Sequence, residues 1–250
     1  MPTLGVIPAR LGSTRLPRKP LQPLAGVPLI LRVVERVRAL GCVDMLVVAT
    51  DAPEIAAVVE PTGVACAITS SAHETGTERV AEVAARPDYA GFDPVVNIQG
   101  DEPFLPRDAL AGAIARVGQG DDVGSAAAPL APADAADPGR VKVVLDGRGR
   151  ALYFSRAAIP FNRDGRARAD GLYWQHLGVY ACRRAALLRW AALPPSALEQ
   201  AERLEQLRAL QDGITFGIAR LGAPALPGID TPEDLRRAEA FWQETQGVTT

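Results

Sequence analysis

The stretch TLGVIPARLGSTRLPRKPL, residues 3–21, joins an apolar segment to a loop rich in positive charge. Residues 3–9 are apolar at almost every position, which is typical of a strand buried on both faces of a sheet. Four cations follow within ten residues: Arg10, Arg15, Arg18 and Lys19. Pro17 and Pro20 stiffen this loop, which lowers the entropy lost on binding. We expect a rigid anion-binding loop after the first strand, with a solvated surface loop as the alternative.

The first 100 residues alternate between short apolar runs and segments of helical spacing. The apolar runs predict strands at 3–9, 45–50, 64–68 and 94–99. The helical spacing predicts helices at 28–40, 53–60 and 77–86. Strands that are apolar on both faces and separated by helices form a mostly parallel sheet flanked by helices, an α/β fold. In such sheets ligands bind beyond the carboxyl ends of the strands.

The second half of the chain has a different pattern. Strand-like runs at 141–146, 147–155 and 176–183, with a hairpin turn at 146–149, predict an inserted smaller β lobe at about 135–190. The polar, arginine-rich stretch 156–173 is a candidate lid. An amphipathic helix is expected at 198–211, and a last helix begins after Thr231 as N-cap with Pro232 at its first position. We find no linker, so a single domain, 1–250, is predicted.

Composition excludes several classes of function. The net charge of −2 and 5% aromatic content give no support to nucleic-acid or membrane binding. The three cysteines are odd in number and widely spaced, which indicates a reducing compartment. With no signal peptide or apolar run of membrane-spanning length in the sequence, we expect a cytoplasmic protein.

The motifs that carry chemistry are few. The sequence has no dinucleotide fingerprint, no P-loop and no Cys/His cluster of zinc spacing. NIQGDEP, residues 97–103, places Asp101 where the fourth strand ends, and carboxylates beside a phosphate-binding loop suit Mg²⁺. Asp230, just before the last helix, is a second metal candidate or a capping residue. Two carboxylates from distant segments can hold a metal on a triphosphate for in-line attack at phosphorus.

Eight blocks, in order from residue 7 to 235, resemble the 3-deoxy-manno-octulosonate (Kdo) cytidylyltransferases, also called CMP-Kdo synthetases. They read IPAR-x-x-STRLP-x-KPL, H-x-x-GTER, NIQGDEP, VKVV, ALYFSR-x-x-IP, HLGVYA, LEQLR and GIDTPEDL. Sialic-acid cytidylyltransferases resemble the first block but typically differ after its serine. The resemblance implies a Rossmann-like nucleotide-diphospho-sugar transferase fold and attack of the Kdo anomeric hydroxyl on the CTP α-phosphate, with Mg²⁺, giving CMP-Kdo and diphosphate. It also implies a homodimer that supplies Kdo for lipopolysaccharide biosynthesis.

The same resemblance assigns roles to matching positions. It implies that the catalytic residues are Arg10, Lys19, Asp101 and Asp230, the two aspartates being the metal ligands. It implies nucleotide-binding roles for Ala9, Arg10, Ser13, Lys19, Thr77 and Arg79. It places around the sugar acid Arg15, Gln99, His176, Tyr180, Glu205 and Gln206. A sugar carboxylate needs a cation and its hydroxyls need polar partners, so these residue types are chemically reasonable.

Each assignment has a structural alternative. His176 can be a satisfied core histidine, Tyr180 can simply pack, and Glu205 and Gln206 can form the solvated face of an ordinary helix. Arg156 can guide the nucleotide or brace the lobe. At the level of function, the alternatives are a cytidylyltransferase for 8-amino-Kdo or another acidic sugar, and a non-catalytic nucleotide-binding regulator.

Overall fold

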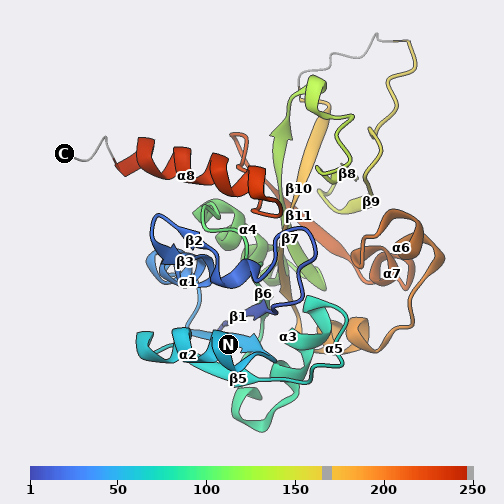
Figure 1. Ribbon diagram of the computed structural model, residues 1–250. Coiled ribbons are helices and arrows are strands. Elements are labelled where there is room, and N and C mark those ends of the chain that lie inside the picture. The colour runs from blue at the N-terminus through green and yellow to red at the C-terminus, as the bar shows by residue number, and fades with distance from the viewer. Residues whose placement is uncertain (165–170, 247–250) are drawn as a thin grey trace.

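The computed structural model describes residues 1–164 and 171–246, which fold around a nine-stranded, mostly parallel sheet (Figure 1). Seven strands follow the order β11-β7-β10-β6-β1-β4-β5, and β8 and β9 attach to β10. The strands are β1 (Leu4–Ala9), β4 (Met45–Thr50), β5 (Ala65–Ile68), β6 (Val95–Asn97), β7 (Val123–Leu130), β8 (Lys142–Leu145), β9 (Ala151–Ser155), β10 (Tyr173–Cys182) and β11 (Phe216–Arg220). A separate two-stranded sheet consists of β2 (Pro23–Leu24) and β3 (Val27–Pro28).

Strand β1 lies in the centre of the sheet, paired in parallel with β4 on one side and β6 on the other. Its side chains alternate between two cores. Leu4 and Val6 face one apolar cluster and Ile7 faces the other, all of them fully buried. This burial on both faces explains why the strand is apolar at successive positions rather than at every second one.

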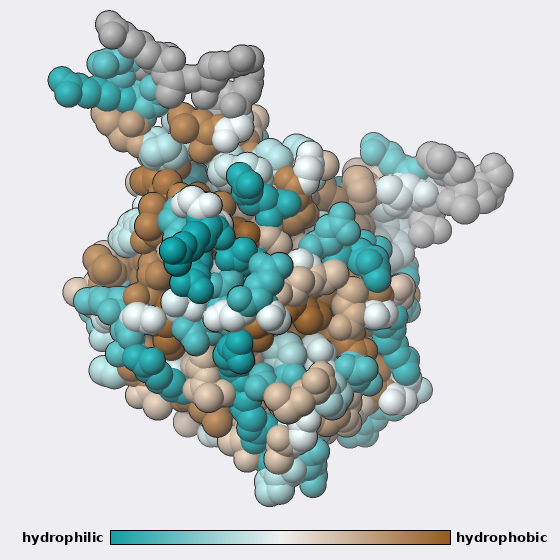
Figure 2. Space-filling view, turned by 180° about the vertical axis from the view of Figure 1, so that it is seen from behind, coloured by the Kyte–Doolittle hydropathy of each residue, from teal (hydrophilic) through white to brown (hydrophobic). Residues whose placement is uncertain are grey.

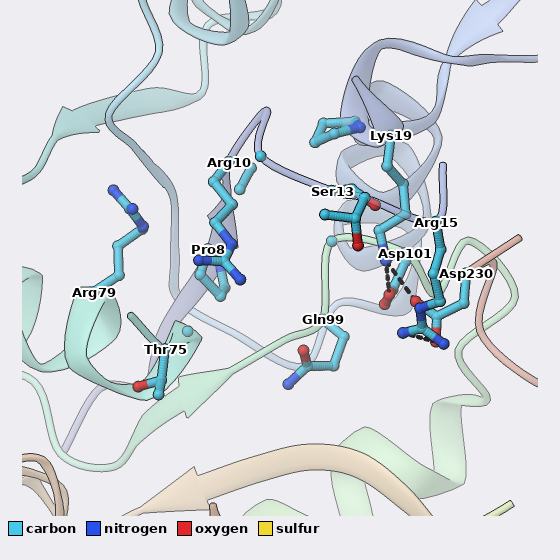
Figure 3. Close-up of a pocket in the computed structure, with 16 residues that line it drawn as sticks. Pro8, Arg10, Ser13, Arg15, Lys19, Thr75, Arg79, Gln99, Asp101 and Asp230 are labelled. Carbon is cyan, nitrogen blue, oxygen red and sulfur yellow. Dashed lines mark hydrogen bonds and ion pairs between the residues drawn. The ribbon is translucent and has the colours of Figure 1, made fainter. Parts of the chain in front are cut away.

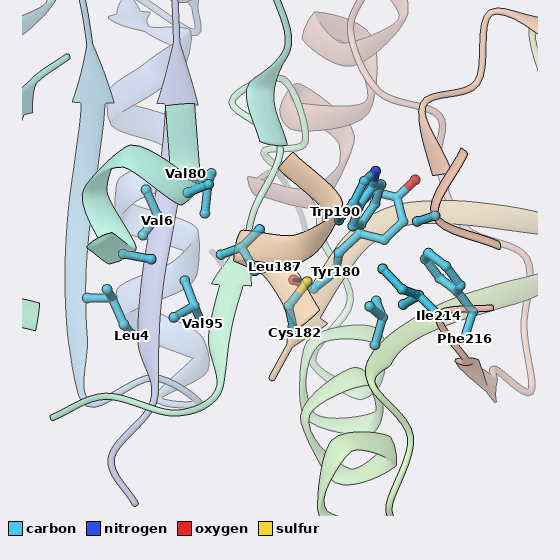
Figure 4. Packing of buried hydrophobic residues seen from close by; sticks show 14 of the residues in the cluster. Leu4, Val6, Val80, Val95, Tyr180, Cys182, Leu187, Trp190, Ile214 and Phe216 are labelled. Atoms are coloured by element: carbon cyan, nitrogen blue, oxygen red, sulfur yellow. Dashed lines mark hydrogen bonds between the residues drawn. The ribbon is translucent and has the colours of Figure 1, made fainter. Parts of the chain in front are cut away.

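Helices cover both faces of the sheet. The cluster on the Leu4 and Val6 side contains side chains of α3, α5 and α7, with Tyr180, Trp190 and Phe216 stacked edge to face (Figure 4). The opposite cluster contains side chains of α1, α2 and α4. The helices are α1 (Leu29–Leu40), α2 (Pro53–Val59), α3 (Gly76–Ala85), α4 (Arg107–Gly118), α5 (Arg184–Ala192), α6 (Ala197–Glu202), α7 (Gln206–Gln211) and α8 (Pro232–Gln246). Short 3₁₀ turns lie at η1 (Lys19–Leu21), η2 (Glu60–Thr62), η3 (Pro87–Tyr89) and η4 (Pro132–Asp134).

The predicted β lobe consists of a hairpin that continues into the main sheet. Strands β8 and β9 form the hairpin around the predicted turn, and β8 meets β10 at Lys142 and Gln175. Strand β10 then runs antiparallel between β7 and β6. Figure 1 shows the hairpin projecting from one end of the sheet. The candidate lid at 156–173 includes residues 165–170, which lie outside the described residues, so closure stays a prediction.

Most elements expected in the first 100 residues are confirmed to within a residue or two. The last helix also begins as predicted, because the Asp234 amide donates to the Thr231 hydroxyl at 3.2 Å. The prediction of one helix over 198–211 is wrong, because two short helices are separated by Arg203, whose φ is 54°. Four further elements, α4, α5, β7 and β11, were not predicted from the sequence. Strand β7 contains three alanines, a glycine and a proline, all residues of low strand propensity.

The surface agrees with the composition. In the view from behind, hydrophilic residues are spread over the face with hydrophobic residues between them (Figure 2). Among the described residues, no helix combines the length and apolar character needed to cross a bilayer.

Candidate active site

A cavity of about 290 Å³ opens beyond the carboxyl ends of β1 and β6 and is called the cationic cavity here. Its walls come from the loop after β1, the start of α3, the segment after β6 and the turn before α8 (Figure 3). The lining residues are Pro8, Ala9, Arg10, Gly12, Ser13, Thr14, Arg15, Lys19, Pro20, Thr75, Gly76, Arg79, Gln99, Gly100, Asp101 and Asp230. The structure therefore brings the opening loop and both predicted metal ligands to one place.

Lys19 lies between the two aspartates. Its Nζ donates to Asp101 Oδ2 at 2.5 Å and to Asp230 Oδ1 at 2.9 Å (Figure 3). Burial opposes the charge on the ammonium, but the two carboxylates outweigh it and raise the pKa of Lys19 above its ordinary value. Burial likewise opposes ionisation of Asp230, yet Lys19 and Arg15 lower its pKa overall. Lys19 and Asp230 are thus both charged at neutral pH.

Glu102, next to Asp101, has a different environment. Burial, followed by the charges of Asp101 and Asp230, raises its pKa to about 8. Its side chain does not line the cationic cavity. The two adjacent acids of the GDEP motif therefore lie in different environments, because Asp101 lines the cationic cavity and Glu102 does not.

The remaining cations of the opening loop point in different directions. Arg15 pairs with Asp230 at 3.0 Å and lines the cationic cavity, and its side chain is 66% exposed. Arg10 also lines the cavity and donates to the Glu74 carbonyl at 3.2 Å. Arg18, by contrast, lies 3.7 Å from Glu54 and is not part of the wall. Three of the four cations therefore line the cationic cavity.

The start of α3 forms the opposite wall. Thr75 caps this helix through the Glu78 amide, which places the N-terminus of α3 at the cavity, where a helix favours anions. Gly76 fits here because a Cβ would lie 3.3 Å from the Pro8 ring. Arg79 also lines the cavity and is 2% exposed, held by the Thr69 hydroxyl and by Asp51 at 3.4 Å.

Thr77, predicted to bind nucleotide, does not line the cationic cavity. Its side chain is fully buried, and its hydroxyl donates to Glu205 Oε1 at 2.6 Å. Ser13 does line the cavity, where its hydroxyl accepts from the Leu16 amide at 3.3 Å and holds the loop in shape.

A second cavity, of about 280 Å³, lies beside strand β10 and is called the β10 cavity here. Its lining residues are Gln99, Val141, Arg156, His176, Gly178, Tyr180, Arg203, Leu204, Glu205 and Gln206. Gln99 belongs to both cavities and donates to the Gly178 carbonyl at 2.9 Å. The two cavities therefore share a wall, and five of the six residues predicted around the sugar acid line the second one. Arg15 is the exception.

His176 and Tyr180 belong to an aromatic stack and also face the β10 cavity. His176 packs against Phe154 and Tyr180, with ring centroids 4.7 and 5.4 Å away. Its Nε2 lies 2.9 Å from the Ser125 hydroxyl, which donates to a backbone carbonyl and so accepts from the ring. Burial lowers the pKa of His176 to about 3 and raises that of Tyr180. Both side chains are neutral polar groups at pH 7.

Glu205 and Gln206 reach the cavity because the expected helix is broken. Arg203 adopts the left-handed conformation, which ends α6, and Leu204 then enters the core. The Arg156 guanidinium holds the break by donating to the carbonyls of Glu202 and Arg203, at 2.8 and 3.3 Å. Arg156 therefore braces the lobe while also lining the cavity.

Lys142 is a structural residue that the sequence analysis did not single out. Its side chain is fully buried, and Nζ donates to the carbonyls of Asp137, Arg140 and Arg156, at 2.8, 2.5 and 2.6 Å. Burial lowers its pKa. One signal was present in the sequence, since only two of the 27 basic residues are lysines, Lys19 and Lys142. An ammonium provides the three donors that three carbonyls require.

The donor set of the cationic cavity fits Mg²⁺. Asp101 and Asp230 are carboxylates that converge on one point, now marked by the Lys19 ammonium. The described residues contain no cluster of three or more potential metal ligands. Two carboxylates agree with the preference of Mg²⁺ for one or two protein ligands supplemented by substrate phosphates.

Comparisons with known proteins agree with this geometry. The sequence profile of the family described as cytidylyltransferase matches residues 4–216. A 3-deoxy-manno-octulosonate cytidylyltransferase from Gemmatimonas aurantiaca is 51% identical over 245 residues, covering 97% of this chain and 95% of the relative. A solved CMP:2-keto-3-deoxy-manno-octonic acid synthetase complexed with CTP matches with a TM-score of 0.90 and 37% identity, covering 98% of this chain and all of that one.

A more distant structure shares the fold alone. It is a putative glucose-1-phosphate thymidylyltransferase from Bacillus anthracis in complex with a sucrose, with a TM-score of 0.66, 16% identity, and coverage of 96% of this chain and 94% of that one. The family match over residues 4–216 and the 51% identical relative show that the chain is a nucleotidyltransferase. Within that class, the chain belongs to the cytidylyltransferase family.

Proposed function

We infer that this chain is a Kdo cytidylyltransferase, which transfers CMP from CTP to Kdo and releases diphosphate. The observation that carries this conclusion is the pair of adjoining cavities that share Gln99. One has the charges that a triphosphate requires, and the other has the polar side chains, among them His176, Tyr180 and Gln206, that a polyhydroxylated sugar requires. The relatives named for this reaction support both halves of the assignment.

The reaction is a displacement at phosphorus. The anomeric hydroxyl oxygen of Kdo forms a bond to the α-phosphorus of CTP, the bond to the oxygen bridging to the β-phosphate breaks, and diphosphate leaves with that electron pair. The hydroxyl proton is lost to solvent or to a phosphate oxygen. Most of the rate enhancement comes from alignment of the two reactants and from neutralisation of phosphate charge.

Residues of the cationic cavity supply this charge neutralisation. Lys19 and Arg10 provide positive charge from one side, and the N-terminus of α3 provides backbone dipoles from the other. Gln99, in the shared wall, orients the two substrates toward each other. Arg15 stands at the Asp230 end of the cationic cavity, where it can reach a sugar carboxylate that approaches the phosphates.

We propose that Asp101 and Asp230 hold Mg²⁺ during turnover. Bound there, the ion would neutralise phosphate charge and favour ionisation of the sugar hydroxyl. Lys19 keeps the two carboxylates together in the substrate-free protein, which offsets the repulsion between them.

We further propose a cytoplasmic homodimer that supplies Kdo for lipopolysaccharide biosynthesis. The three cysteines, Cys42, Cys66 and Cys182, are free, which supports a reducing compartment. The homodimer and the pathway are supported by the family resemblance, and sedimentation of the purified protein tests the assembly.

Diphosphate release by the purified protein tests the reaction. We expect release with CTP, Kdo and Mg²⁺, strong preference for CTP over the other nucleoside triphosphates, and loss of activity with EDTA that Mg²⁺ restores. Release only with 8-amino-Kdo or a nonulosonate would retain the nucleotide assignment and overturn the sugar assignment. Silence with every acidic sugar would favour a non-catalytic nucleotide-binding protein.

A further inference from the structure

Thr77 lies between the two cavities without lining either of them. It belongs to the first turn of α3, where Thr75, Gly76 and Arg79 line the cationic cavity. Its own side chain is fully buried and points toward the segment before α7, where its hydroxyl meets Glu205. Because Glu205 lines the β10 cavity, this hydrogen bond joins the walls of both cavities across 128 residues of sequence.

The bond leaves a specific set of unsatisfied acceptors. Thr77 donates its only proton to Glu205 Oε1, and the Asn97 amide lies 3.5 Å from the Thr77 oxygen. Glu205 Oε2 and Asn97 Oδ1 are buried and have no hydrogen-bond partner among the described residues. A buried acceptor without a partner is costly, so a donor from water or from a bound ligand is expected at such a site.

The geometry restricts how Glu205 can meet that ligand. Thr77 holds Oε1, and this contact fixes one oxygen of a carboxyl group whose residue lines the β10 cavity. Burial raises the pKa of Glu205, whereas hydrogen bonds from Thr77 and then Thr75, and the charge of Arg208, oppose that rise. A carboxyl group at the end of a flexible side chain needs such a contact to keep one orientation.

We propose that Thr77 is a positioning residue for the sugar acid, acting through Glu205, and not a nucleotide ligand. This inference rests on the proposed function, because it identifies the β10 cavity as the Kdo site. Thr77 orients the Glu205 carboxyl group at the wall of the β10 cavity, and it connects the nucleotide-binding end of α3 to the sugar-binding end of α7. The nearly isosteric change Thr77→Val breaks this connection without opening a cavity.

Steady-state kinetics of Thr77→Val separate the two substrates. We expect the KM for Kdo to rise about 10-fold or more, since the contact that orients Glu205 is lost, while the KM for CTP stays within about twofold. Thr77→Ser keeps the hydroxyl and is expected to restore the KM for Kdo. In a Glu205→Ala background, Thr77→Val is expected to have little further effect, because the partner is already absent.

Thr215→Val is the matched control. The Thr215 hydroxyl also donates to a carboxylate, Asp122 Oδ2 at 2.8 Å, but it lines neither cavity. This variant is expected to lose stability without a change in either KM. Equal increases in both KM values for Thr77→Val, or full additivity with Glu205→Ala, would overturn the inference while leaving the proposed function intact. Failure of the wild-type protein to use Kdo would overturn the proposed function instead.

Discussion

The cationic cavity and the β10 cavity adjoin each other but are built in opposite ways. The first relies on full charges, with Lys19 and Arg15 held by ion pairs to Asp101 and Asp230. The second also contains Arg156 and Arg203 in its wall, but its buried strand β10 presents the neutral polar groups His176 and Tyr180, whose charged forms are suppressed by burial. A site for a triphosphate can stay partly solvated because its ligand is highly charged. A site for sugar hydroxyls gains its specificity from desolvated, fixed partners.

The origins of the two cavities differ as well. One contiguous loop supplies much of the wall of the cationic cavity, so its cations can be recognised in the sequence. The β10 cavity depends on Arg156, Lys142 and the backbone break at Arg203, which come from segments up to 61 residues apart and hold one another through backbone carbonyls. Substitutions in the cationic cavity are therefore expected to reduce catalysis. Substitutions around the β10 cavity are expected to reduce both the stability of the protein and its affinity for the sugar.

Replacement of Lys19 should have the largest effect. We expect Lys19→Ala to lower kcat/KM by on the order of 10²- to 10³-fold, because a charge aimed at the phosphates is lost. Arg18→Asn is the control, since Arg18 neighbours Lys19 in sequence but faces Glu54, and asparagine tolerates its φ of 53°. Equal losses in the two folded variants would show that loop charge in general, and not the placement of Lys19, matters.

Replacement of Lys142 tests whether the three carbonyls that it holds stabilise the segment behind the β10 cavity. We expect Lys142→Met to lower the free energy of unfolding by about 2 to 4 kcal/mol, because three buried carbonyls lose their donor. Urea denaturation at pH 7 measures this loss. The KM for Kdo should rise more than that for CTP, since Lys142 holds the backbone of Arg156, which lines the β10 cavity and not the cationic cavity. An unchanged free energy of unfolding would contradict the structural role of the ammonium.

Substitution of His176 should produce the smallest effect, which is a change in how the free energy of unfolding depends on pH. Its pKa is about 3 in the folded protein against 6.5 for an exposed histidine. Between these values the unfolded chain binds a proton that the folded protein does not, so stability falls as the pH drops. Between pH 7 and 5 we expect the wild type to lose about 2 kcal/mol more than His176→Gln. Parallel losses in urea denaturation would show that His176 is not buried in its neutral form.

Local patterns predicted most of the first half of the fold. Strand β1 and helices α1 and α3 follow from apolar periodicity and clear end signals, which depend on neighbouring residues alone. Strand β7 could not be found in this way, because its alanines are suited to a strand only where close-packed neighbours cover them. Gly124 shows this dependence, since a Cβ there would lie 1.8 Å from the Ala113 carbonyl oxygen of α4.

The site shows the same division. Motifs identified Lys19, Asp101 and Asp230, and the structure brings these three side chains within hydrogen-bonding distance. The placement of Thr77 could not be predicted, because its neighbours in the H-x-x-GTER block line the cationic cavity while its own side chain turns to Glu205. A helix directs successive side chains about 100° apart, so membership of a motif does not decide which cavity a residue serves.

The sequence alone determined the α/β class, the rigid cationic loop after the first strand and the identity of the charged residues, because these depend on local periodicity, proline stiffness and side-chain chemistry. Tertiary structure alone decided the meeting of Asp101 with Asp230, the break at Arg203 and the neutral state of His176. Each of these results from contacts between segments distant in the chain, whose burial and electrostatic effects exist only after the sheet has formed.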